Sequence, residues 1–330
     1  MSRHAVANGV SIAVVIPAYR AAHHLEQVVR GIPAFVAHIV VVDDCSPDDT
    51  ALVAARLARS DRRVVVVQHE ANQGVGGATL SGYRRAVELG AEVIVKMDSD
   101  DQMDPAYLPA LIAPILSGQA DYTKGNRFLH TRQLAAMPGV RRFGNGGLSF
   151  LTKLASGYWN VFDPTNGFAA IHAKAASLLD ETAIDHRYFF ETSMLLELSL
   201  LRAVVKDVYI PARYGTETSH LSEYKALREF PPRLLRGWLR RIWVQYFLRD
   251  FGLFSIFLVA GLMFLIFGLG FGTYHWALGA YLRSPTGTGT VMIAVLPVIL
   301  GVQFLLQALL LDVQNVPAHA LQAQEAISIE

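Results

Sequence analysis

Cysteine is nearly absent from this sequence, because Cys45 is the only one among 330 residues. A single cysteine excludes an internal disulfide framework and leaves the redox compartment open. Charged side chains are also scarce, at 17% of the residues, whereas soluble domains have roughly 25%. The formal net charge of +1 argues against nucleic acid or another polyanionic partner.

The N-terminus lacks the basic patch, apolar core and cleavage site of a signal peptide, so we expect none. Hydrophobic residues, 52% of the chain, are instead concentrated toward the C-terminal end. Residues 251–272 and 291–311 contain no charged side chain. Both stretches exceed the roughly 18 apolar residues that indicate a transmembrane helix, so the sequence predicts a membrane hairpin.

The residues that flank this hairpin indicate its orientation. The connector 273–290 carries only Arg283, whereas four arginines precede the first apolar stretch: Arg236, Arg240, Arg241 and Arg249. The positive-inside rule then puts both ends of the hairpin in the cytoplasm, as in a multi-pass protein of the plasma (inner) membrane. Residues 226–250 are typical of an amphipathic helix at a membrane interface, although an ordinary core helix would have the same pattern.

Apolar runs alternate with helical patterns through the first hundred residues. Continuous apolarity indicates strands covered on both faces, and the alternation with helices indicates βαβ units. We therefore expect an α/β fold with an open, mostly parallel, Rossmann-like sheet and helices on both faces. The strands are expected at residues 12–16, 39–42, 64–67 and 93–95. Helices are expected at 25–32 and 78–89, and a third, capped by Ser46 or Asp48, is expected to end at about residue 59.

Acidic residues follow the fourth of these strands directly. Asp98 and Asp100 lie two residues apart, where open α/β sheets bind their ligands. Mg²⁺ is commonly held by one or two carboxylates together with substrate phosphates, so a cation that binds a diphosphate is one interpretation. A solvated acidic loop is the other.

Polar residues also follow the other strands, at the same predicted edge of the sheet. Tyr19, Asp43, Asp44 and Asn72 would line one crevice with the acidic loop, although the two aspartates could simply begin a turn. The glycines of residues 72–78 precede a helix and could let backbone amides approach a phosphate. Their spacing differs from that of the dinucleotide-binding fingerprint.

Four motifs in this order resemble the nucleotide-sugar half of the family 2 glycosyltransferases, which have the GT-A fold. The resemblance covers roughly the first two-thirds of the chain. The motifs are residues 14–19 (VVIPAY), 41–46 (VVDDCS), 72–78 (NQGVGGA) and 98–102 (DSDDQ).

This resemblance implies a nucleotide-sugar donor site and a bound Mg²⁺ or Mn²⁺. The donor would be bound by Pro17, Tyr19, Val42, Asp44, Asp98, Ser99 and Gln102, and the metal by Asp98, Asp100 and Gln102. Many polyprenyl-phosphate relatives have Asn-Glu after the tyrosine, whereas this chain has Arg20-Ala21. That departure leaves the sugar open, and the nucleotide could be UDP or GDP.

Further elements downstream resemble the catalytic half of the same transferases. They imply three catalytic candidates in addition to Asp100: Arg127 in a Gly-x-Arg-Phe element, Asp163 in an Asp-x-x-x-Gly-Phe element, and Arg213 in a late Arg-x-Tyr-Gly loop. Asp163 could instead cap an Asp-Pro turn. Glu191 occupies the position of an acidic residue that would orient the sugar or an arginine.

The sequence thus predicts a transferase domain (1–225), a juxtamembrane helix (226–250), a transmembrane hairpin (251–312) and a cytoplasmic tail (313–330). The expected activity is inverting, metal-dependent transfer of a sugar to a polyprenyl phosphate at the cytoplasmic membrane face. Two alternatives remain: a family 2 transferase acting on a glycan or another lipid for the cell envelope, and a non-catalytic, membrane-anchored nucleotide-binding scaffold. The sequence leaves both a monomer and a homo-oligomer open.

Overall fold

The computed structural model describes residues 9–127, 139–211 and 223–323. The chain divides into two compact units. The first contains residues 1–238 and 317–330, and the second contains residues 239–316. The division therefore falls inside the helix expected at residues 226–250, and the C-terminal segment belongs to the first unit.

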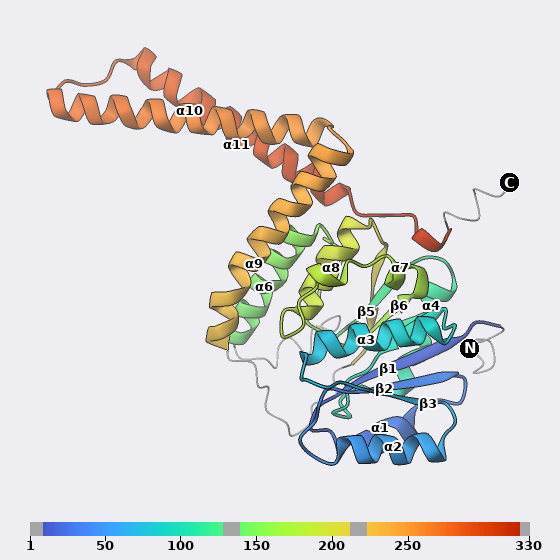
Figure 1. Ribbon diagram of the computed structural model, residues 1–330. Coiled ribbons are helices and arrows are strands. Elements are labelled where there is room, and N and C mark those ends of the chain that lie inside the picture. The colour runs from blue at the N-terminus through green and yellow to red at the C-terminus, as the bar shows by residue number, and fades with distance from the viewer. Residues whose placement is uncertain (1–8, 128–138, 212–222, 324–330) are drawn as a thin grey trace. The chain divides into compact units, whose positions relative to one another are not determined.

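A seven-stranded sheet forms the centre of the first unit (Figure 1). Its order is β3-β2-β1-β4-β6-β5-β7, and only β6 runs antiparallel to its neighbours. This confirms the predicted open, mostly parallel sheet. The strands are β1 (Ile12–Ala18), β2 (His38–Asp43), β3 (Val64–Gln68), β4 (Val93–Lys96), β5 (Tyr122–Asn126), β6 (Ala169–His172) and β7 (Val205–Tyr209).

Helices cover both faces of this sheet, as Figure 1 shows for α1 and α2 below it and α3 above it. Apolar side chains of α1 (Leu25–Gly31), α2 (Thr50–Ser60) and α4 (Leu108–Leu116) share one core cluster with alternate residues of β1 and β2. The other residues of these strands face α3 (Gly74–Glu88). There, a Cβ on Gly82 would lie 2.2 Å from Val15 Cγ1, so glycine permits the close approach.

A smaller apolar cluster joins the remaining long helices of the first unit. Phe189, Leu196, Phe230 and Leu234 meet there with Ala155. These helices are α6 (Gly139–Ser156), α8 (Phe190–Leu200) and the first part of α9 (Glu223–Trp243). The shorter helical elements are η1 (Pro105–Tyr107), α7 (Ala173–Ser177), η2 (Glu181–Ala183) and η4 (Leu321–Ala323).

The C-terminal segment packs against the edge of the first unit near α4 and β5. Ala320 is buried in the main core cluster. The buried Asp121 carboxylate accepts hydrogen bonds from the backbone N–H groups of Leu321 (3.0 Å) and Gln322 (3.4 Å). Gln322 Nε2 donates to the carbonyl oxygens of Ile115 (3.0 Å) and Ala120 (2.8 Å). The chain after the hairpin is therefore part of the folded first unit.

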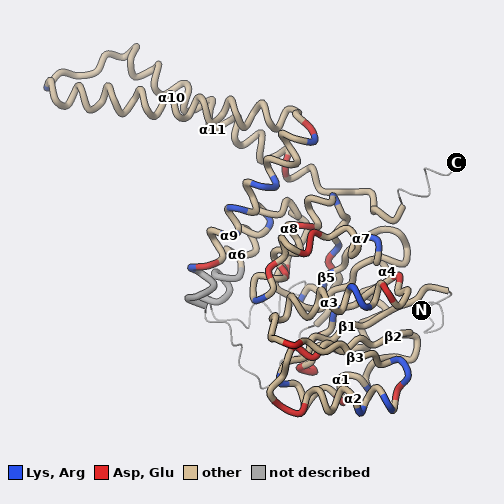
Figure 2. The backbone as a smooth tube through the Cα atoms, in the orientation of Figure 1, with Lys and Arg blue, Asp and Glu red and all other residues tan. Residues whose placement is uncertain are grey.

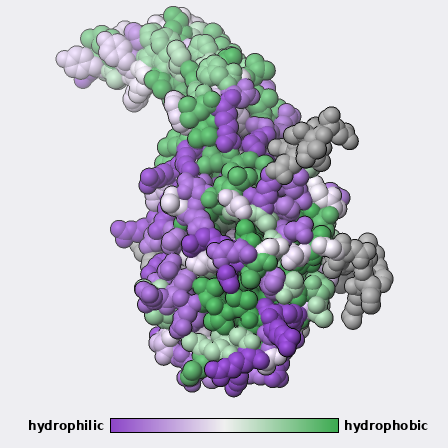
Figure 3. Space-filling model, turned by 45° about the vertical axis from the view of Figure 1, so that its right-hand side comes forward, coloured by the Kyte–Doolittle hydropathy of each residue, from purple (hydrophilic) through white to green (hydrophobic). Residues whose placement is uncertain are grey.

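The second unit is a helical hairpin formed by α10 (Leu253–Leu282) and α11 (Thr288–Gln314). Both helices are long and apolar enough to cross a membrane. Figure 2 shows that they carry almost no charged residues, and Figure 3 shows a largely hydrophobic surface over them. The connector is shorter than the predicted 273–290, because α10 continues to Leu282. Arg283 then ends the helix in a left-handed conformation (φ 51°), two residues before Pro285.

Close packing holds the two hairpin helices together. A Cβ on Gly261 would meet Leu305 at 2.9 Å, and a Cβ on Gly268 would meet Val298 at 2.7 Å. Phe304 of α11 contacts both Phe257 and Phe264 of α10. Small residues that let helix backbones approach are typical of membrane helix pairs.

One buried ion pair lies at the base of the hairpin. Arg241 donates to both carboxylate oxygens of Asp312, at 2.6 and 3.0 Å, and the Tyr246 hydroxyl donates to the same carboxylate at 2.6 Å. Both charged side chains are buried. Arg241, one of the four arginines counted for the orientation, is therefore buried and paired.

The apolar residues of the predicted amphipathic helix do not form one face. Ile242 and Tyr246 are buried in the protein, whereas Leu235, Leu239 and Trp243 are each more than half exposed. Because the exposed three are spaced four residues apart, they form a separate stripe along α9. The helix therefore has a core-facing side and a second apolar stripe that the protein leaves uncovered.

Candidate active site

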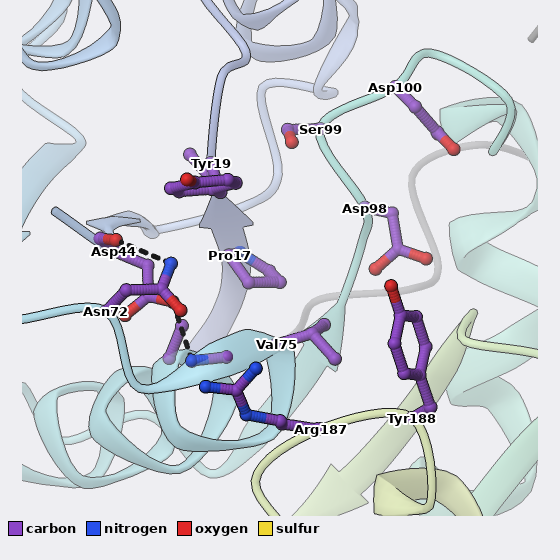
Figure 4. Close-up of a pocket in the computed structure, with 13 residues that line it drawn as sticks. Pro17, Tyr19, Asp44, Asn72, Val75, Asp98, Ser99, Asp100, Arg187 and Tyr188 are labelled. Carbon is purple, nitrogen blue, oxygen red and sulfur yellow. Dashed lines mark hydrogen bonds between the residues drawn. The ribbon is translucent and has the colours of Figure 1, made fainter. Parts of the chain in front are cut away.

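A pocket of about 470 Å³ lies at the carboxyl ends of β1, β2 and β4. Figure 4 shows Asp98 and Asp100 along one side, Asp44 and Asn72 along the opposite side, and Tyr19 and Pro17 between them. The structure thus brings both sides of the predicted crevice together. The lining residues are Pro17, Ala18, Tyr19, Asp44, Asn72, Gly74, Val75, Ala78, Asp98, Ser99, Asp100, Arg187 and Tyr188.

Asp44 holds one side of the pocket together. Its carboxylate accepts hydrogen bonds from the backbone N–H groups of Gln73 (2.8 Å) and Gly74 (2.7 Å), at the start of α3. His69 Nδ1 lies 2.7 Å from the same carboxylate. A carboxylate at a helix N-terminus satisfies backbone donors and interacts favourably with the helix dipole. Asp44 is therefore a buried organiser of the pocket wall.

The same contacts explain why α3 begins at Gly74, four residues before the predicted start at residue 78. The glycine-rich turn also packs against residues 185–187, and Gly76 N–H donates to the His186 carbonyl oxygen at 2.8 Å. A Cβ on Gly76 would lie 2.4 Å from the Asp185 carbonyl oxygen. The amides of residues 73, 74 and 76 are thus engaged within the protein, and the absence of a side chain on Gly74 and Gly76 permits the close packing against residues 185–187.

Arg187 and Tyr188 line the pocket, although the sequence did not single them out. In Figure 4 the Tyr188 hydroxyl points toward Asp98, and the Arg187 guanidinium points toward the side that carries Asn72. These residues lie 89 and 90 positions after Asp98 in the sequence. The one available signal was their place just before Glu191, in a segment that resembles the family.

A buried lysine fixes the position of Asp98. Lys96 Nζ donates to Asp98 Oδ1 at 2.6 Å and lies 3.6 Å from Glu191 Oε1. Burial acts to lower the pKa of Lys96, but the two carboxylates raise it above its ordinary value. Glu191, expected to orient a sugar or an arginine, lies beside this lysine.

The acidic loop suits a divalent cation. Among the described residues, no three His, Cys, Asp or Glu side chains are arranged to hold a metal. Two carboxylates, Asp98 and Asp100, do line the pocket, and two carboxylates with substrate phosphates are a common donor set for Mg²⁺. Ser99 lines it as well. The residues present therefore fit the implied Mg²⁺ or Mn²⁺, and substrate phosphates would supply further ligands.

Two predicted binding residues lie outside the pocket lining. Gln102 contacts the loop through its backbone N–H, which donates to Asp100 Oδ1 at 3.0 Å. Val42 is fully buried in β2, and its side chain is directed toward Gly82 of α3. Alternate strand residues face opposite sides of the sheet, so Val42 packs against the helix instead of pointing into the pocket.

Arg127 and Asp163 form a pair with each other. Arg127 donates to Asp163 through Nε (2.7 Å) and Nη2 (3.0 Å), and its backbone N–H lies 3.3 Å from the same carboxylate. Asp163 is completely buried, whereas the Arg127 side chain is 38% exposed. This fork-to-carboxylate geometry fixes the guanidinium. Neither residue lines the pocket, and Arg213 lies outside the described residues.

Comparison with known proteins identifies the family. The model of the family described as "Glycosyl transferase family 2" matches residues 13–179. The UDP-N-acetylglucosamine–dolichyl-phosphate N-acetylglucosaminyltransferase of Methanococcus voltae is 33% identical over 232 residues, which cover 65% of this chain and 92% of that protein. The undecaprenyl-phosphate mannosyltransferase of Micrococcus luteus is 31% identical over 173 residues, which cover 52% and 70%.

A solved structure supports the fold. Glucosyl-3-phosphoglycerate synthase from Mycobacterium tuberculosis, in complex with Mn²⁺, UDP-glucose and phosphoglyceric acid, aligns with a TM-score of 0.52 and 21% identity, covering 71% of this chain and 80% of that one. The sheet therefore has the GT-A fold. The chain belongs to glycosyl transferase family 2.

Proposed function

We propose that this protein transfers a sugar from a nucleotide sugar to a polyprenyl phosphate, with inversion at the anomeric carbon. The observation that carries the proposal is a pocket that combines Asp98 and Asp100 with the ends of β1 and β2, in a chain that also has two helices able to cross a membrane. The names of both relatives add a lipid phosphate as the acceptor.

The donor would lie across the pocket, with its nucleoside toward Asp44 and Asn72 and its diphosphate toward Asp98 and Asp100. A bound Mg²⁺ or Mn²⁺ would supply positive charge that stabilises the leaving diphosphate. Tyr19 is 46% exposed at the pocket, so its ring is available to the base or ribose. The names of the Methanococcus relative and the mycobacterial complex favour UDP over GDP as the nucleotide.

The reaction would be a single displacement. A phosphate oxygen of the acceptor forms the new bond to the anomeric carbon, and the bond from that carbon to the diphosphate oxygen breaks. The acceptor phosphate is already anionic near neutral pH, so no strong general base is required. Arg127, held rigid by Asp163, would orient the acceptor phosphate, and Arg213 is proposed as a second phosphate ligand.

The hairpin would place this chemistry at the membrane. The helices α10 and α11 would cross the bilayer of the plasma (inner) membrane, with the transferase unit and the C-terminal segment in the cytoplasm. The exposed stripe of Leu235, Leu239 and Trp243 would lie in the interface, beside the arginines of α9. A membrane-embedded acceptor would then present its phosphate on the side of the membrane where the soluble donor is found.

The test is a product analysis with the purified full-length chain in detergent. A panel of UDP- and GDP-sugars is offered together with a polyprenyl phosphate and Mg²⁺ or Mn²⁺, and the lipid product is identified by mass. We expect one sugar to be added to the lipid phosphate. A polymeric product would indicate the alternative glycan acceptor, and consumption of no donor would contradict the proposal.

Two neighbouring aspartates provide a matched pair of variants. Asp100→Asn should lower transfer by at least about a hundredfold, because the cation loses a charged ligand. Asp101→Asn should retain activity, because Asp101 does not line the pocket and instead accepts a hydrogen bond from Gln27. Asparagine also tolerates the left-handed backbone of Asp101 (φ 59°). Equal activities of the two variants would contradict the assigned role of Asp100.

A further inference from the structure

Lys96 is a buried cation directly behind the pocket. It is the last residue of β4, is 1% exposed and does not line the pocket. Its Nζ donates to Asp98 Oδ1 (2.6 Å) and to the Gly167 carbonyl oxygen (3.3 Å), and lies 3.6 Å from Glu191 Oε1. These three partners come from the acidic loop, the segment before β6 and helix α8, so one ammonium group joins three separate parts of the chain.

The packing around this ammonium group leaves little freedom. A Cβ on Gly167 would lie 2.6 Å from Asp98 Oδ2 and 2.7 Å from Lys96 Nζ, so the backbone of residue 167 rests directly on the ion pair. An ammonium group has three N–H donors, and three acceptors surround this one. A buried charge is tolerated only when it is paired and hydrogen-bonded. Lys96 therefore has a single well-defined position, and it fixes the position of the Asp98 carboxylate.

We propose that Lys96 is a positioning residue for the donor site. It holds the Asp98 carboxylate in the orientation that faces the pocket, and it couples that orientation to α8 and to Gly167. The inference rests on the proposed function, because the ligand that Asp98 would contact is the cation bound with the donor diphosphate. Without Lys96, the carboxylates of Asp98 and Glu191 would repel each other, and Asp98 would leave its present orientation.

The sign of the effect on cation binding separates positioning from simple electrostatics. Coulomb attraction alone predicts that removing a positive charge beside a cation site tightens binding of the cation. Positioning predicts the reverse, because a displaced Asp98 no longer offers its oxygens to the cation. A measurement of Mn²⁺ affinity therefore distinguishes the two explanations without any sugar transfer.

The experiment titrates Mn²⁺, with UDP present, into the full-length chain and follows free Mn²⁺ by electron paramagnetic resonance. Lys96→Met should weaken Mn²⁺ binding at least fivefold. The double variant Lys96→Met/Glu191→Gln removes one charge of each sign, so it replaces the single variant if that variant does not fold. It should weaken Mn²⁺ binding at least threefold. Binding as tight as that of the wild-type chain, or tighter, would overturn the proposal.

Lys124 provides the matched control. It is also a completely buried lysine, and its Nζ donates to the carbonyl oxygen of Asn166, the residue next to Gly167. Within the described residues it makes no hydrogen bond to the acidic loop. Lys124→Met should therefore change Mn²⁺ affinity less than twofold. An equal loss in both lysine variants would show a general structural effect and would overturn the positioning role.

The wild-type titration separates this inference from the proposed function. If the wild-type chain bound no Mn²⁺ with UDP, the metal-dependent function would be contradicted, and the role of Lys96 would fall with it. If the wild-type chain bound Mn²⁺ and Lys96→Met bound it equally well, only the positioning role would be contradicted.

Discussion

Buried charged residues have different roles in the two units of this chain. The transferase unit buries Asp44 in the pocket wall and Lys96 behind the pocket. It also buries Lys124 and Asp163 beside the segment that leads to β6, and each of the four is hydrogen-bonded to a separate part of the chain. The described residues of the hairpin unit contain one buried ion pair, Arg241–Asp312, at its base. Hydrogen-bonded charged residues thus support a ligand site in the first unit. In the second unit the ion pair joins α9 to α11, whereas α10 and α11 associate by close packing.

Breaking the hairpin pair should have the largest effect. Asp312→Ala leaves the Arg241 guanidinium buried without its counter-ion, which should cost about 3–5 kcal/mol of stability. The measurement is thermal unfolding in detergent. Arg241→Met/Asp312→Leu removes both charges and should recover most of the loss. If the double variant were as unstable as Asp312→Ala, the pair would not act through its buried charge.

Lys124 should make the stability of the transferase unit depend on pH. Burial lowers the pKa of Lys124 to about 8, below its value of about 10.4 in an unfolded chain. The unfolded state then binds the proton more tightly, so stability rises as the pH increases from 8 to 10.4 and is at its lower level below pH 8. Denaturant unfolding should show this rise, on the order of 3 kcal/mol, in the wild-type chain relative to Lys124→Met. If the stability of the wild-type chain and of Lys124→Met changed with pH in the same way, the lowered pKa of Lys124 would be contradicted.

Gly76→Ala should disturb the pocket without removing any polar group. The new Cβ would lie 2.4 Å from the Asp185 carbonyl oxygen, so the loop that carries Arg187 and Tyr188 must shift. We expect a loss of about 1–3 kcal/mol of stability and weaker nucleotide binding by calorimetry. Gly147→Ala is the control, because it lies in α6 with nothing within 4 Å of the added Cβ, and it should be neutral or slightly stabilising.

The smallest effect is expected where the C-terminal segment meets the transferase unit. Gln322→Ala removes two hydrogen bonds to the carbonyl oxygens of Ile115 and Ala120, for a loss of about 1–2 kcal/mol. Gln119→Ala removes only an exposed contact with Lys206 and should change stability by less than about 0.5 kcal/mol. Proteolysis near residue 320 would increase in the first variant alone. If the two variants were equally stable, the C-terminal segment would not contribute to the stability of the transferase unit.

The local sequence pattern was sufficient to predict the first four strands of the sheet. The runs at residues 12–16, 39–42, 64–67 and 93–95 are continuous and β-branched, so each indicates a buried strand, and the polar residues after them mark one edge. Five pocket residues could be predicted because they lie at that edge: Tyr19, Asp44, Asn72, Asp98 and Asp100. The two apolar helices follow from composition alone.

Contacts between distant segments could not be predicted in the same way. Arg187 and Tyr188 reach the pocket only because the 185–188 loop packs against the glycines of α3, which no local periodicity encodes. The pairing of Arg127 with Asp163 joins residues 36 positions apart. The start of α3 was placed too late, because the carboxylate that caps it comes from Asp44, at the end of β2.

The return of the chain to the transferase unit after the hairpin constrains membrane insertion. Ala320 is buried in the same core as β1 and β2, so the polypeptide leaves and rejoins one folded body. Such a loop can pass through a bilayer only an even number of times. If the hairpin inserts as proposed, translocating one helix alone would pull Ala320 out of that core, so the two helices would have to cross the bilayer as a pair.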